Sequence, residues 1–279
     1  MSERIFILGA GRAGLGLARA LRASGADVVG VHGRHNPGGP DGVTTGALSP
    51  SLREATVVII AVRDGQIDDA VRELDAAGLA AHAVVLHASG SAEPRALDVL
   101  RAHGHPCGTF HPLLPLADPA RASVLFRDAW VGIDGDRTAK DVARALAARL
   151  GAHTLEIPAG AKSRYHAAAV LASNFPVVLL ALAEQLLTEA GIDAAEARGA
   201  LRPLFLAAAD NVGSRSAAEA LTGPVVRGDV STVRSHLDVL RDDPELLDVY
   251  RSLARATIAV AREAGAEEER LREIGELLD

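Results

Sequence analysis

The sequence has only one cysteine, Cys107, and only two lysines among its 29 basic residues. A single cysteine excludes an internal disulfide bond and any zinc site built from several cysteines. The two lysines, Lys140 and Lys162, stand in a chain that otherwise uses arginine. A lysine that is kept against such a bias is a candidate for a role that needs a titratable amine.

Two further features are missing, an excess of positive charge and a long apolar run. The formal net charge is −7 and no basic stripe is present, so we expect no nucleic-acid partner. The longest apolar stretch, Phe175–Ala183, is too short to span a bilayer and contains Pro176. A signal peptide requires a basic segment before its apolar run, and none precedes the first apolar run here. We therefore expect a cytoplasmic protein without a membrane partner.

The first half of the chain alternates short apolar runs with segments of helical spacing. Strands are predicted at Arg4–Leu8, Asp27–Val31, Val57–Val62, Ala83–His87, Thr109–His111, Ala129–Ile133 and His153–Ile157. Helices are predicted between them at Ala13–Ala23, Gln66–Ala76, Glu93–His103 and Ala139–Leu150. This alternation is typical of a Rossmann domain, a doubly wound parallel sheet covered by helices.

The pattern changes after Pro158, and no further strand is predicted. Helices are expected at Ala161–Ala190, Ala194–Val212, Arg215–Leu221, Val230–Arg241, Pro244–Ala264 and Glu267–Leu278. Their predicted N-caps include Asp193, Ser214 and Asp229. We place the boundary near residue 157, between a sheet domain of residues 1–157 and an all-helical domain of residues 158–279.

The helix predicted at Ala161–Ala190 is apolar on nearly every face. Pro176 is expected to kink this helix without ending it, because the apolar pattern resumes at once. Such a helix must be covered by something, and a helical domain of about a hundred residues supplies only a thin core. We expect a homodimer through the C-terminal helices.

A glycine motif follows the first predicted strand. Gly9, Gly11 and Gly14, with Arg12 and Ala13 between them, form the pattern G-x-G-x-x-G and open the first helix. In this context the glycines allow a tight turn, approach of a diphosphate to the backbone, and close packing of helix on strand. The amide groups at the helix start favour an anion. The alternative is a glycine-rich turn of another α/β fold.

The second strand ends at Val31 and is followed by Arg34, without the acidic residue that an NAD site uses for the ribose hydroxyl. An arginine here suits a 2′-phosphate, so NADP is favoured over NAD, unless Arg34 is only a residue of an exposed loop. The Gly/Pro-rich stretch Asn36–Gly42 is predicted to be a surface loop. Further cofactor-binding residues are expected where later strands end, namely Val62, Arg63 and His87.

The candidate chemical groups gather near the domain boundary. Lys162 and His166 are four residues apart and face one side of the long helix. His111, stiffened by Pro112, ends a strand and can act as an acid, a base or a hydrogen-bond donor. The simpler interpretation is a solvated first helical turn and a histidine that only orients its turn.

Three residues are candidates for binding the substrate. Ser89 follows a strand, Asn174 lies inside the apolar helix, and Arg227 belongs to the loop Thr222–Asp229. Polar groups in apolar surroundings need partners, and an arginine can hold an anionic group. A structural turn for Ser89 and a structural loop for Arg227 are equally good interpretations. No Ser-His-Asp order, P-loop or histidine-based zinc spacing is present, which leaves hydrolase and kinase functions unsupported.

The chain resembles the Rossmann-like family with a C-terminal DUF2520 domain, and more distantly pyrroline-5-carboxylate reductase and the β-hydroxyacid dehydrogenases. The matching stretches are Gly9–Gly14, Val58–Asp64, His87–Gly90, Phe110–Leu113, Lys162–Phe175 and Leu221–His236. The resemblance implies an NAD(P)-dependent oxidoreductase whose helical domain dimerises. Lys162 matches the lysine that assists catalysis in β-hydroxyacid dehydrogenases, whereas His166 stands about where those enzymes have asparagine. The loop Thr222–Asp229 replaces the glycine-rich loop of pyrroline-5-carboxylate reductase, which argues against proline synthesis.

The leading hypothesis is an NADP-dependent oxidoreductase that transfers hydride between nicotinamide and a small carbonyl or imine. Lys162 is the expected proton donor, with a pKa lowered by its apolar surroundings. His166 and His111 are expected to assist. Two alternatives stay open: a non-catalytic NADP-binding sensor or scaffold, and a prephenate-dehydrogenase-like enzyme suggested by His111 and Pro112 alone.

Overall fold

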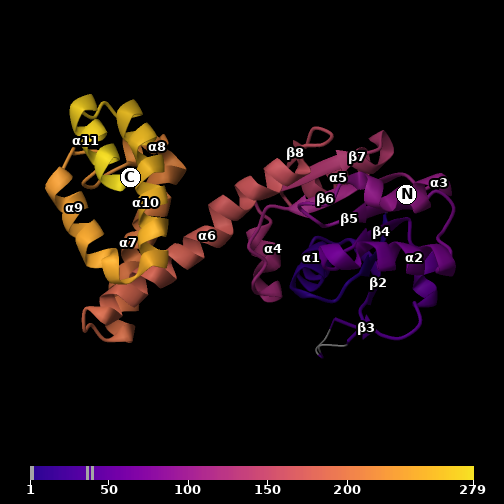
Figure 1. The fold of residues 1–279 in the computed structure, drawn as a ribbon. Helices are drawn as coiled ribbons and strands as arrows, with labels where there is room; N and C mark the ends of the chain where they lie inside the picture. Colours follow the sequence, from indigo (N-terminus) through magenta and orange to yellow (C-terminus); the bar gives the residue numbers. More distant parts are fainter. Residues whose placement is uncertain (1–2, 36–37, 39–40) are drawn as a thin grey trace. The chain divides into compact units, whose positions relative to one another are not determined.

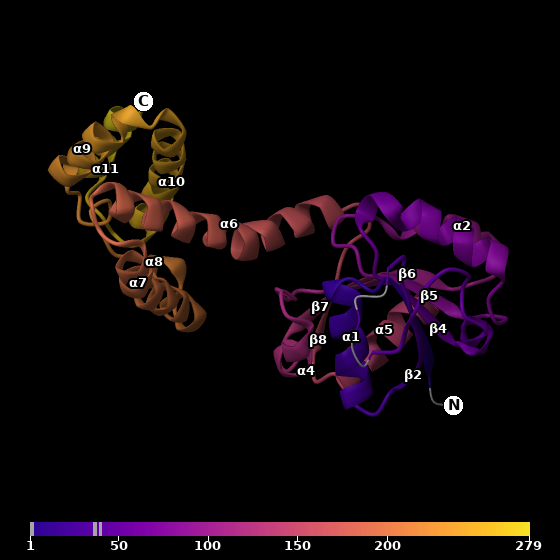
Figure 2. The ribbon, with the colours of Figure 1, turned by 90° about the horizontal axis from the view of Figure 1, so that it is seen from below.

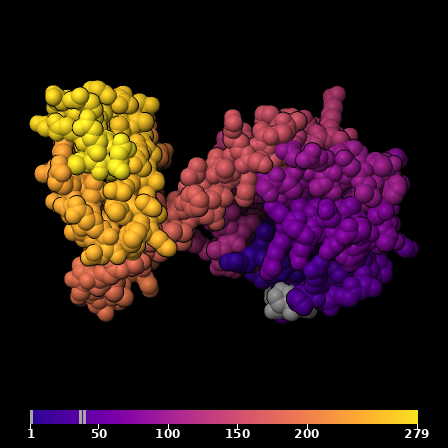
Figure 3. Space-filling model, in the orientation of Figure 1, coloured from indigo at the N-terminus to yellow at the C-terminus, as the bar shows by residue number. Residues whose placement is uncertain are grey.

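The computed structural model describes residues 3–35, 38 and 41–279 (Figure 1). The loop predicted at Asn36–Gly42 therefore falls largely outside the described residues. The contacts divide the chain into two compact units, residues 1–174 and residues 175–279. Each unit is closely packed in space-filling view (Figure 3), with the first coloured from indigo to pink and the second from orange to yellow.

Within the described residues, the N-terminal unit holds one eight-stranded sheet of the order β3-β2-β1-β4-β5-β6-β7-β8. The strands are β1 (Arg4–Leu8), β2 (Asp27–His32), β3 (Val43–Thr44), β4 (Val57–Ile60), β5 (Val84–His87), β6 (Cys107–Pro112), β7 (Trp130–Gly135) and β8 (His153–Glu156). The predicted doubly wound Rossmann sheet is confirmed. The order runs outward in both directions from the β1–β4 pair, and this reversal is where open α/β sheets bind ligands.

One pair of strands departs from the parallel arrangement. β7 pairs antiparallel with β6, with His111 opposite Gly132. The segment between them forms a 3-10 turn, η4 (Pro119–Arg121), and a short helix, α4 (Ala122–Leu125), and both pack on α1. A parallel connection would have to return to the end of the sheet where β6 begins. This segment does not return, so β7 begins at the end of the sheet where β6 stops and runs back beside it.

Helices cover both faces of the sheet. They are α1 (Arg12–Ala23), α2 (Ile67–Ala77), α3 (Asp98–Ala102) and α5 (Arg137–Arg149), with 3-10 turns η1 (Pro50–Glu54), η2 (Asp64–Gln66) and η3 (Pro94–Leu97). The helix predicted at Glu93–His103 is thus split into η3 and α3. Ile5 and Ile7 pack with α1, α4 and α5, whereas Phe6 and Leu8 pack with α2 and α3. Figure 2 shows α2 on one side of the strands and α1 on the other.

The turn between β1 and α1 packs closely against the backbone that follows β4. Gly9 has φ +128°, and a Cβ there would lie 2.2 Å from the Ala61 carbonyl oxygen. A Cβ at Gly14 would lie 1.8 Å from the carbonyl oxygen of Gly9. At Gly11, by contrast, a Cβ would meet no atom within 4 Å. Two glycines are therefore required by packing, and Gly11 is left facing open space.

The C-terminal unit contains helices and no strand among its residues. The helices are α6 (Lys162–Glu189), α7 (Ala194–Ser214), α8 (Ala217–Ala220), α9 (Val230–Val239), η5 (Leu240–Asp242), α10 (Pro244–Glu263) and α11 (Glu268–Leu278). α6 passes through Pro176 unbroken. The two compact units meet inside α6, between Asn174 and Phe175, whereas the end of the strand pattern suggested a boundary near residue 157. The first turns of α6 belong to the sheet unit because Lys162 and Tyr165 contact it.

The N-caps of α7 and α9 are Asp193 and Asp229, as predicted, and each side-chain carboxylate accepts hydrogen bonds from its helix. Ser214 is not an N-cap. It is the last residue of α7, and α8 is capped instead by Ser216 in a reciprocal arrangement with Glu219. The Ser-x-x-Glu spacing at Ser216 forms a stronger cap than Ser214 could, because the backbone N–H groups of both Ser216 and Glu219 are bonded.

The middle of α6 carries an exposed apolar surface. Leu171 is 63% exposed, Phe175 51% and Val177 68%. On α7, Leu204 is 65% exposed and Leu206 55%. Among the described residues, α6 alone is long and apolar enough to span a bilayer by length and composition. An apolar surface of this kind is a candidate for an interface.

The glycine turn makes a testable prediction about stability. Gly14→Ala should lower the free energy of unfolding by about 2 kcal/mol or more, because the new methyl group meets a backbone oxygen that cannot move aside. Gly11→Ala is the matched control and should change it by less than about 0.5 kcal/mol. Urea unfolding of both variants measures the difference, and equal stability of the two would contradict this account of the turn.

Candidate active site

A cavity of about 720 Å³ lies where β1, β2 and β4 end. Of the residues predicted to bind a cofactor, Gly9, Gly11, Arg34, Val62 and Arg63 line this cavity. It occupies the point where the strand order reverses, and the three strand ends place glycine backbone and arginine side chains around it.

The amino end of α1 adjoins this cavity through Gly11, which is the N-cap residue. Within the described part of the chain, no side chain accepts a hydrogen bond from the first turn of α1, and that turn contains no acidic residue. Gly11, Arg12 and Ala13 are exposed. Open space beside Gly11 and free amides at a helix start fit the diphosphate of a dinucleotide.

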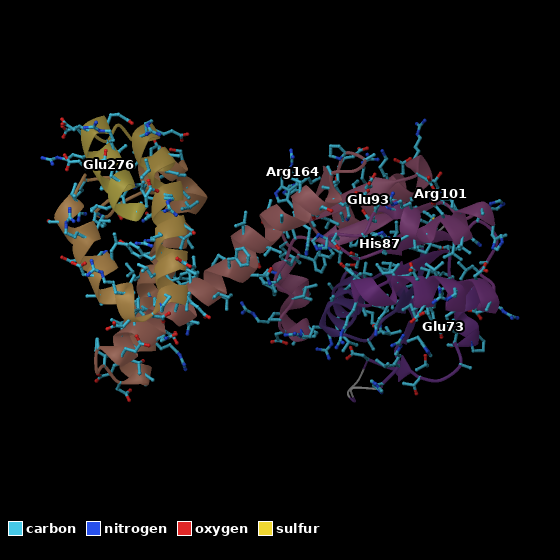
Figure 4. The ribbon with its side chains drawn as sticks, in the orientation of Figure 1. Glu73, His87, Glu93, Arg101, Arg164 and Glu276 are labelled. Carbon is cyan, nitrogen blue, oxygen red and sulfur yellow. The ribbon has the colours of Figure 1, made fainter. Side chains whose placement is uncertain are left out.

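The far end of the cavity is lined by charged side chains. Arg34 and His35 follow β2 and are exposed, and Arg63 follows β4. Arg34 makes a long ion pair with Asp69, at 3.5 Å. Glu73 lines the same cavity from α2 and is marked in Figure 4. The exposed guanidinium groups fit a phosphate on the ribose of the cofactor.

A second group of polar side chains lies further along the same edge of the sheet. Lys162, the first residue of α6, is fully buried, and its Nζ donates a hydrogen bond of 2.9 Å to the carbonyl oxygen of Ser89. Its backbone N–H lies 3.4 Å from a carboxylate oxygen of Glu93. These contacts fasten the start of α6 to the turn that follows β5.

His111 and Tyr165 form a hydrogen-bonded pair in this group. The Nδ1 atom of His111 is 2.7 Å from the Tyr165 hydroxyl oxygen, and the rings meet edge to face at 84°. The Tyr165 ring also lies 5.5 Å from the Lys162 Nζ atom. A strand-end histidine is thereby joined to the helix that carries the lysine.

His166 completes the group. Its ring lies edge to face with that of His111, with centroids 6.0 Å apart. Its Nδ1 atom is enclosed and has no hydrogen-bond partner within the described part of the chain. A Cβ at Gly90 would lie 2.4 Å from this atom and 2.9 Å from Nε2 of His111. Only glycine at position 90 lets both imidazole rings approach the end of β5.

Burial sets the protonation of the lysine. It lowers the pKa of Lys162 from 10.5 to about 8, and the neighbouring carboxylates of Asp134, Glu93 and Asp64 partly oppose this change. The ammonium form remains the major form at neutral pH, yet it loses its proton far more readily than an exposed lysine does. An amine of this kind is suited to proton transfer.

Burial also shifts the pKa values of other groups in the site. Burial lowers the pKa of His111 to about 4, and the nearby Lys162 charge lowers it further. Burial also raises the pKa of Tyr165 well above its usual value, and it raises the pKa of Asp134. At neutral pH, therefore, Lys162 is mostly in its ammonium form while the imidazole of His111 is uncharged.

The structure brings together four of the predicted substrate and catalytic residues: Lys162, His166, His111 and Ser89. Asn174 is exposed further along α6, and among the described residues no hydrogen bond or ion pair joins it to this group. Arg227 is exposed in the C-terminal unit, on the loop before α9.

The placement of His87 needs a correction. It was predicted to bind the cofactor, yet its side chain is fully buried and does not line the cavity. Its Nε2 atom lies 3.4 Å from the backbone oxygen of Glu93. Both residues are labelled in Figure 4. Successive side chains of β5 point to opposite faces of the sheet, and this places the side chain of His87 beneath the loop that follows the strand.

Tyr165 is a residue that sequence reasoning missed. It follows Lys162 by three positions, which places both on one helix face, and it is one of only two tyrosines in the chain. Both signals were available. Its partner was not predictable, because the contact depends on Gly132, where a Cβ would lie 2.3 Å from the tyrosine hydroxyl.

Residues 129–257 match the family described as "Domain of unknown function (DUF2520)", so the chain carries this domain, and the resemblance is confirmed. No curated protein matches the sequence.

Solved structures share the fold at low sequence identity. One is a protein from Bacteroides fragilis named as a candidate NADP oxidoreductase, with 24% identity, a TM-score of 0.73, and coverage of 91% of this chain and 97% of that one. A reductive aminase from Aspergillus terreus in complex with NADPH and ethyl levulinate has 20% identity and a TM-score of 0.59, covering 100% and 93%. A pyrroline-5-carboxylate reductase from Coxiella burnetii has 17% identity and a TM-score of 0.58, covering 99% of each chain.

The lowered pKa of Lys162 predicts a pH dependence of stability. Between about 8 and the unfolded value of 10.5, the unfolded chain holds a proton that the folded protein has released, so the free energy of unfolding rises with pH. From about pH 7 to about pH 10, the wild type should gain roughly 2–3 kcal/mol relative to Lys162→Met. Denaturant unfolding at both pH values tests this, and a difference that does not change with pH would rule out a depressed lysine pKa.

Proposed function

We propose that the protein is an NADP-dependent oxidoreductase that transfers hydride between nicotinamide and a small carbonyl or imine substrate. One observation carries the proposal: a fully buried lysine with a lowered pKa lies at the sheet edge that also carries the glycine turn. The NADP-dependent reductases among the structures of the same fold support an oxidoreductase.

The proposed cofactor site and the polar group adjoin along the sheet. Val62 and Arg63 follow β4, Ser89 and Gly90 follow β5, and His111 belongs to β6, the next strand. A hydrogen bond from the Ser91 hydroxyl to Asp64 links the first two turns. A dinucleotide whose diphosphate lies on α1 would therefore extend its nicotinamide end toward Ser89.

The cofactor would be held by groups that line the cavity or open the helix beside it. The amides of Gly11, Arg12 and Ala13 would bind the diphosphate, and Arg34 would bind the 2′-phosphate. Arg63 would add positive charge between them. The bound nicotinamide would supply or accept the hydride.

Lys162 is the proposed proton donor for the reduction. An ammonium group has three N–H donors, and one of them bonds the Ser89 carbonyl. Because no surface of Lys162 is exposed, the substrate must displace the Ser89 turn slightly to take a proton from Nζ. We assign His166 and His111 to orienting the substrate, and Ser89, Asn174 and Arg227 to binding it.

We also propose that the active protein is a cytoplasmic homodimer. In the C-terminal unit, the exposed apolar side chains of α6 and α7, Phe175, Val177, Leu204 and Leu206 among them, present a surface that a second copy of the same helices would cover.

The choice of cofactor is tested with Arg34→Leu. Removal of the guanidinium should weaken NADPH binding at least 10-fold, about 1.4 kcal/mol, and leave the weaker NADH binding unchanged. Gly11→Ala, which folds normally by the argument above, should weaken both. Calorimetric titration measures the four affinities. Equal loss of NADPH and NADH affinity in Arg34→Leu would show that this arginine does not read the phosphate.

The reaction is tested by oxidation of NADPH across a panel of small ketones, aldehydes and cyclic imines. Lys162→Met should lower kcat by about 100-fold or more with NADPH affinity unchanged, since loss of a general acid costs about this much. Lys140→Met is the matched control, because the only other lysine makes an ion pair with Glu156 away from the site.

Two results would contradict the proposal. Unchanged turnover in Lys162→Met would remove this residue from proton transfer. NADPH binding without oxidation by any member of the panel would favour a sensor over an enzyme.

A further inference from the structure

The His111–Tyr165 pair has a geometry that determines where its protons lie. The hydroxyl oxygen of Tyr165 is 2.7 Å from Nδ1 of His111. One partner must donate and the other accept, and a neutral imidazole has one nitrogen of each kind. The direction of this hydrogen bond therefore decides which ring nitrogen of His111 carries the proton.

The surroundings decide the direction. Tyr165 is held in its protonated form by burial, and His111 is held neutral by burial and by the Lys162 charge. A protonated phenol is the stronger donor of the pair, so its O–H points at Nδ1. The single ring proton of His111 is then on Nε2, as the other nitrogen of a histidine is fixed by the bond that the first one makes.

The Nε2 atom is the part of His111 that faces a ligand. It has no hydrogen-bond partner among the described residues. It is also not one of their enclosed unpaired polar atoms, so it keeps accessible surface. The neighbouring Nδ1 atom of His166 is enclosed, and Lys162 is fully buried. By the same criteria Nε2 of His166 also keeps accessible surface, so the Nε2 atoms of His111 and His166 are the nitrogens of this group that a substrate can contact.

Two glycines make the arrangement possible. Gly132, opposite His111 on β7, leaves the space that the Tyr165 hydroxyl occupies, since a Cβ would lie 2.3 Å from it. Gly90 leaves the space for the two imidazole rings. The rings and the hydroxyl are thus positioned against backbone of β7 and of the turn that follows β5.

We infer that Tyr165 is a positioning residue that fixes His111 as a neutral Nε2–H donor, and that this donor binds the carbonyl oxygen of the substrate. The inference rests on the proposed reductase function for its second half. It assigns His111 to stabilising charge on oxygen, as a neutral imidazole can, and not to acid–base catalysis.

The chemistry narrows the substrate class. When hydride adds to a carbonyl carbon, the C=O π bond breaks and its electron pair moves to oxygen, which then takes a proton from the Lys162 ammonium. A donor aimed at that oxygen is worth most as the charge develops. A protonated imine has no lone pair to accept the Nε2–H bond. A neutral imine nitrogen has a lone pair and can accept this bond, so the donor favours a ketone or an aldehyde specifically over an iminium substrate.

The pair can be tested without cofactor or substrate, by nitrogen-15 NMR of histidine-labelled full-length protein near neutral pH. Wild-type His111, identified by the loss of its signals in His111→Gln, should show a protonated Nε2 and an unprotonated Nδ1. Tyr165→Phe should change this spectrum toward a mixture of tautomers. A protonated Nδ1 in the wild type, or an identical spectrum in Tyr165→Phe, would overturn the inference.

The chain offers a matched control. In the C-terminal unit, His236 Nδ1 lies 2.8 Å from the Tyr250 hydroxyl, with rings edge to face at 88°. Tyr250→Phe should alter the signals of His236 and leave those of His111 unchanged. Loss of the His111 pattern in this variant would mean that the spectra report general loosening of the fold, which would also count against a specific role for Tyr165.

Kinetics separate a neutral donor from an acid–base group. The glutamine of His111→Gln places an N–H donor near the position of Nε2 but cannot titrate, whereas His111→Leu has no donor. With a ketone substrate, His111→Leu should lower kcat by about 100-fold or more, His111→Gln should keep most of the activity, and adding Tyr165→Phe to His111→Gln should cost little more. Equal loss in the glutamine and leucine variants, or faster turnover of iminium substrates than of ketones, would overturn the assignment.

These outcomes are distinct from failure of the proposed function. If NADPH is not bound or not oxidised, the reductase proposal fails together with the substrate-binding half of the inference. The NMR result then stands or falls by itself as a statement about Tyr165 and His111.

Discussion

The buried hydrogen bond from Lys162 to the carbonyl oxygen of Ser89 is the interaction on which the rest of the site depends. A buried ammonium is costly unless it is paired, and here it is held by a backbone oxygen, by the ring of Tyr165 and by the field of nearby carboxylates. The bond fastens the first turn of α6 to the end of β5. Every other contact of the group follows from that placement.

The sheet then supplies two sites from one edge. Parallel strands bring their carboxyl ends together, so the glycine turn after β1 and the turn after β5 open to the same side. The antiparallel pairing of β7 with β6 adds a second constraint, because it sets Gly132 opposite His111 and makes room for the tyrosine. Binding and chemistry are thus separated by only one strand, β4.

The sequence made the local features predictable and left the register-dependent ones out of reach. The glycine turn, the strands and the Lys162–His166 spacing follow from short-range periodicity, and the structure agrees with them. Three features depend on which face of the sheet a side chain occupies and which residue lies opposite it: the burial of His87, the reversal of β7 and the His111–Tyr165 contact. A one-residue shift in strand register would move each side chain to the other face and change its partner. The neutral state of His111 likewise follows from burial that only the folded chain creates.

The most direct test of the central claim is a crystal structure of the protein with NADP bound. We expect a diphosphate on the amides of Gly11 and Ala13, a 2′-phosphate beside Arg34, and a nicotinamide ring against Ser89 within reach of His111. A dinucleotide bound elsewhere, or a nicotinamide directed away from Lys162 and His111, would contradict the central claim.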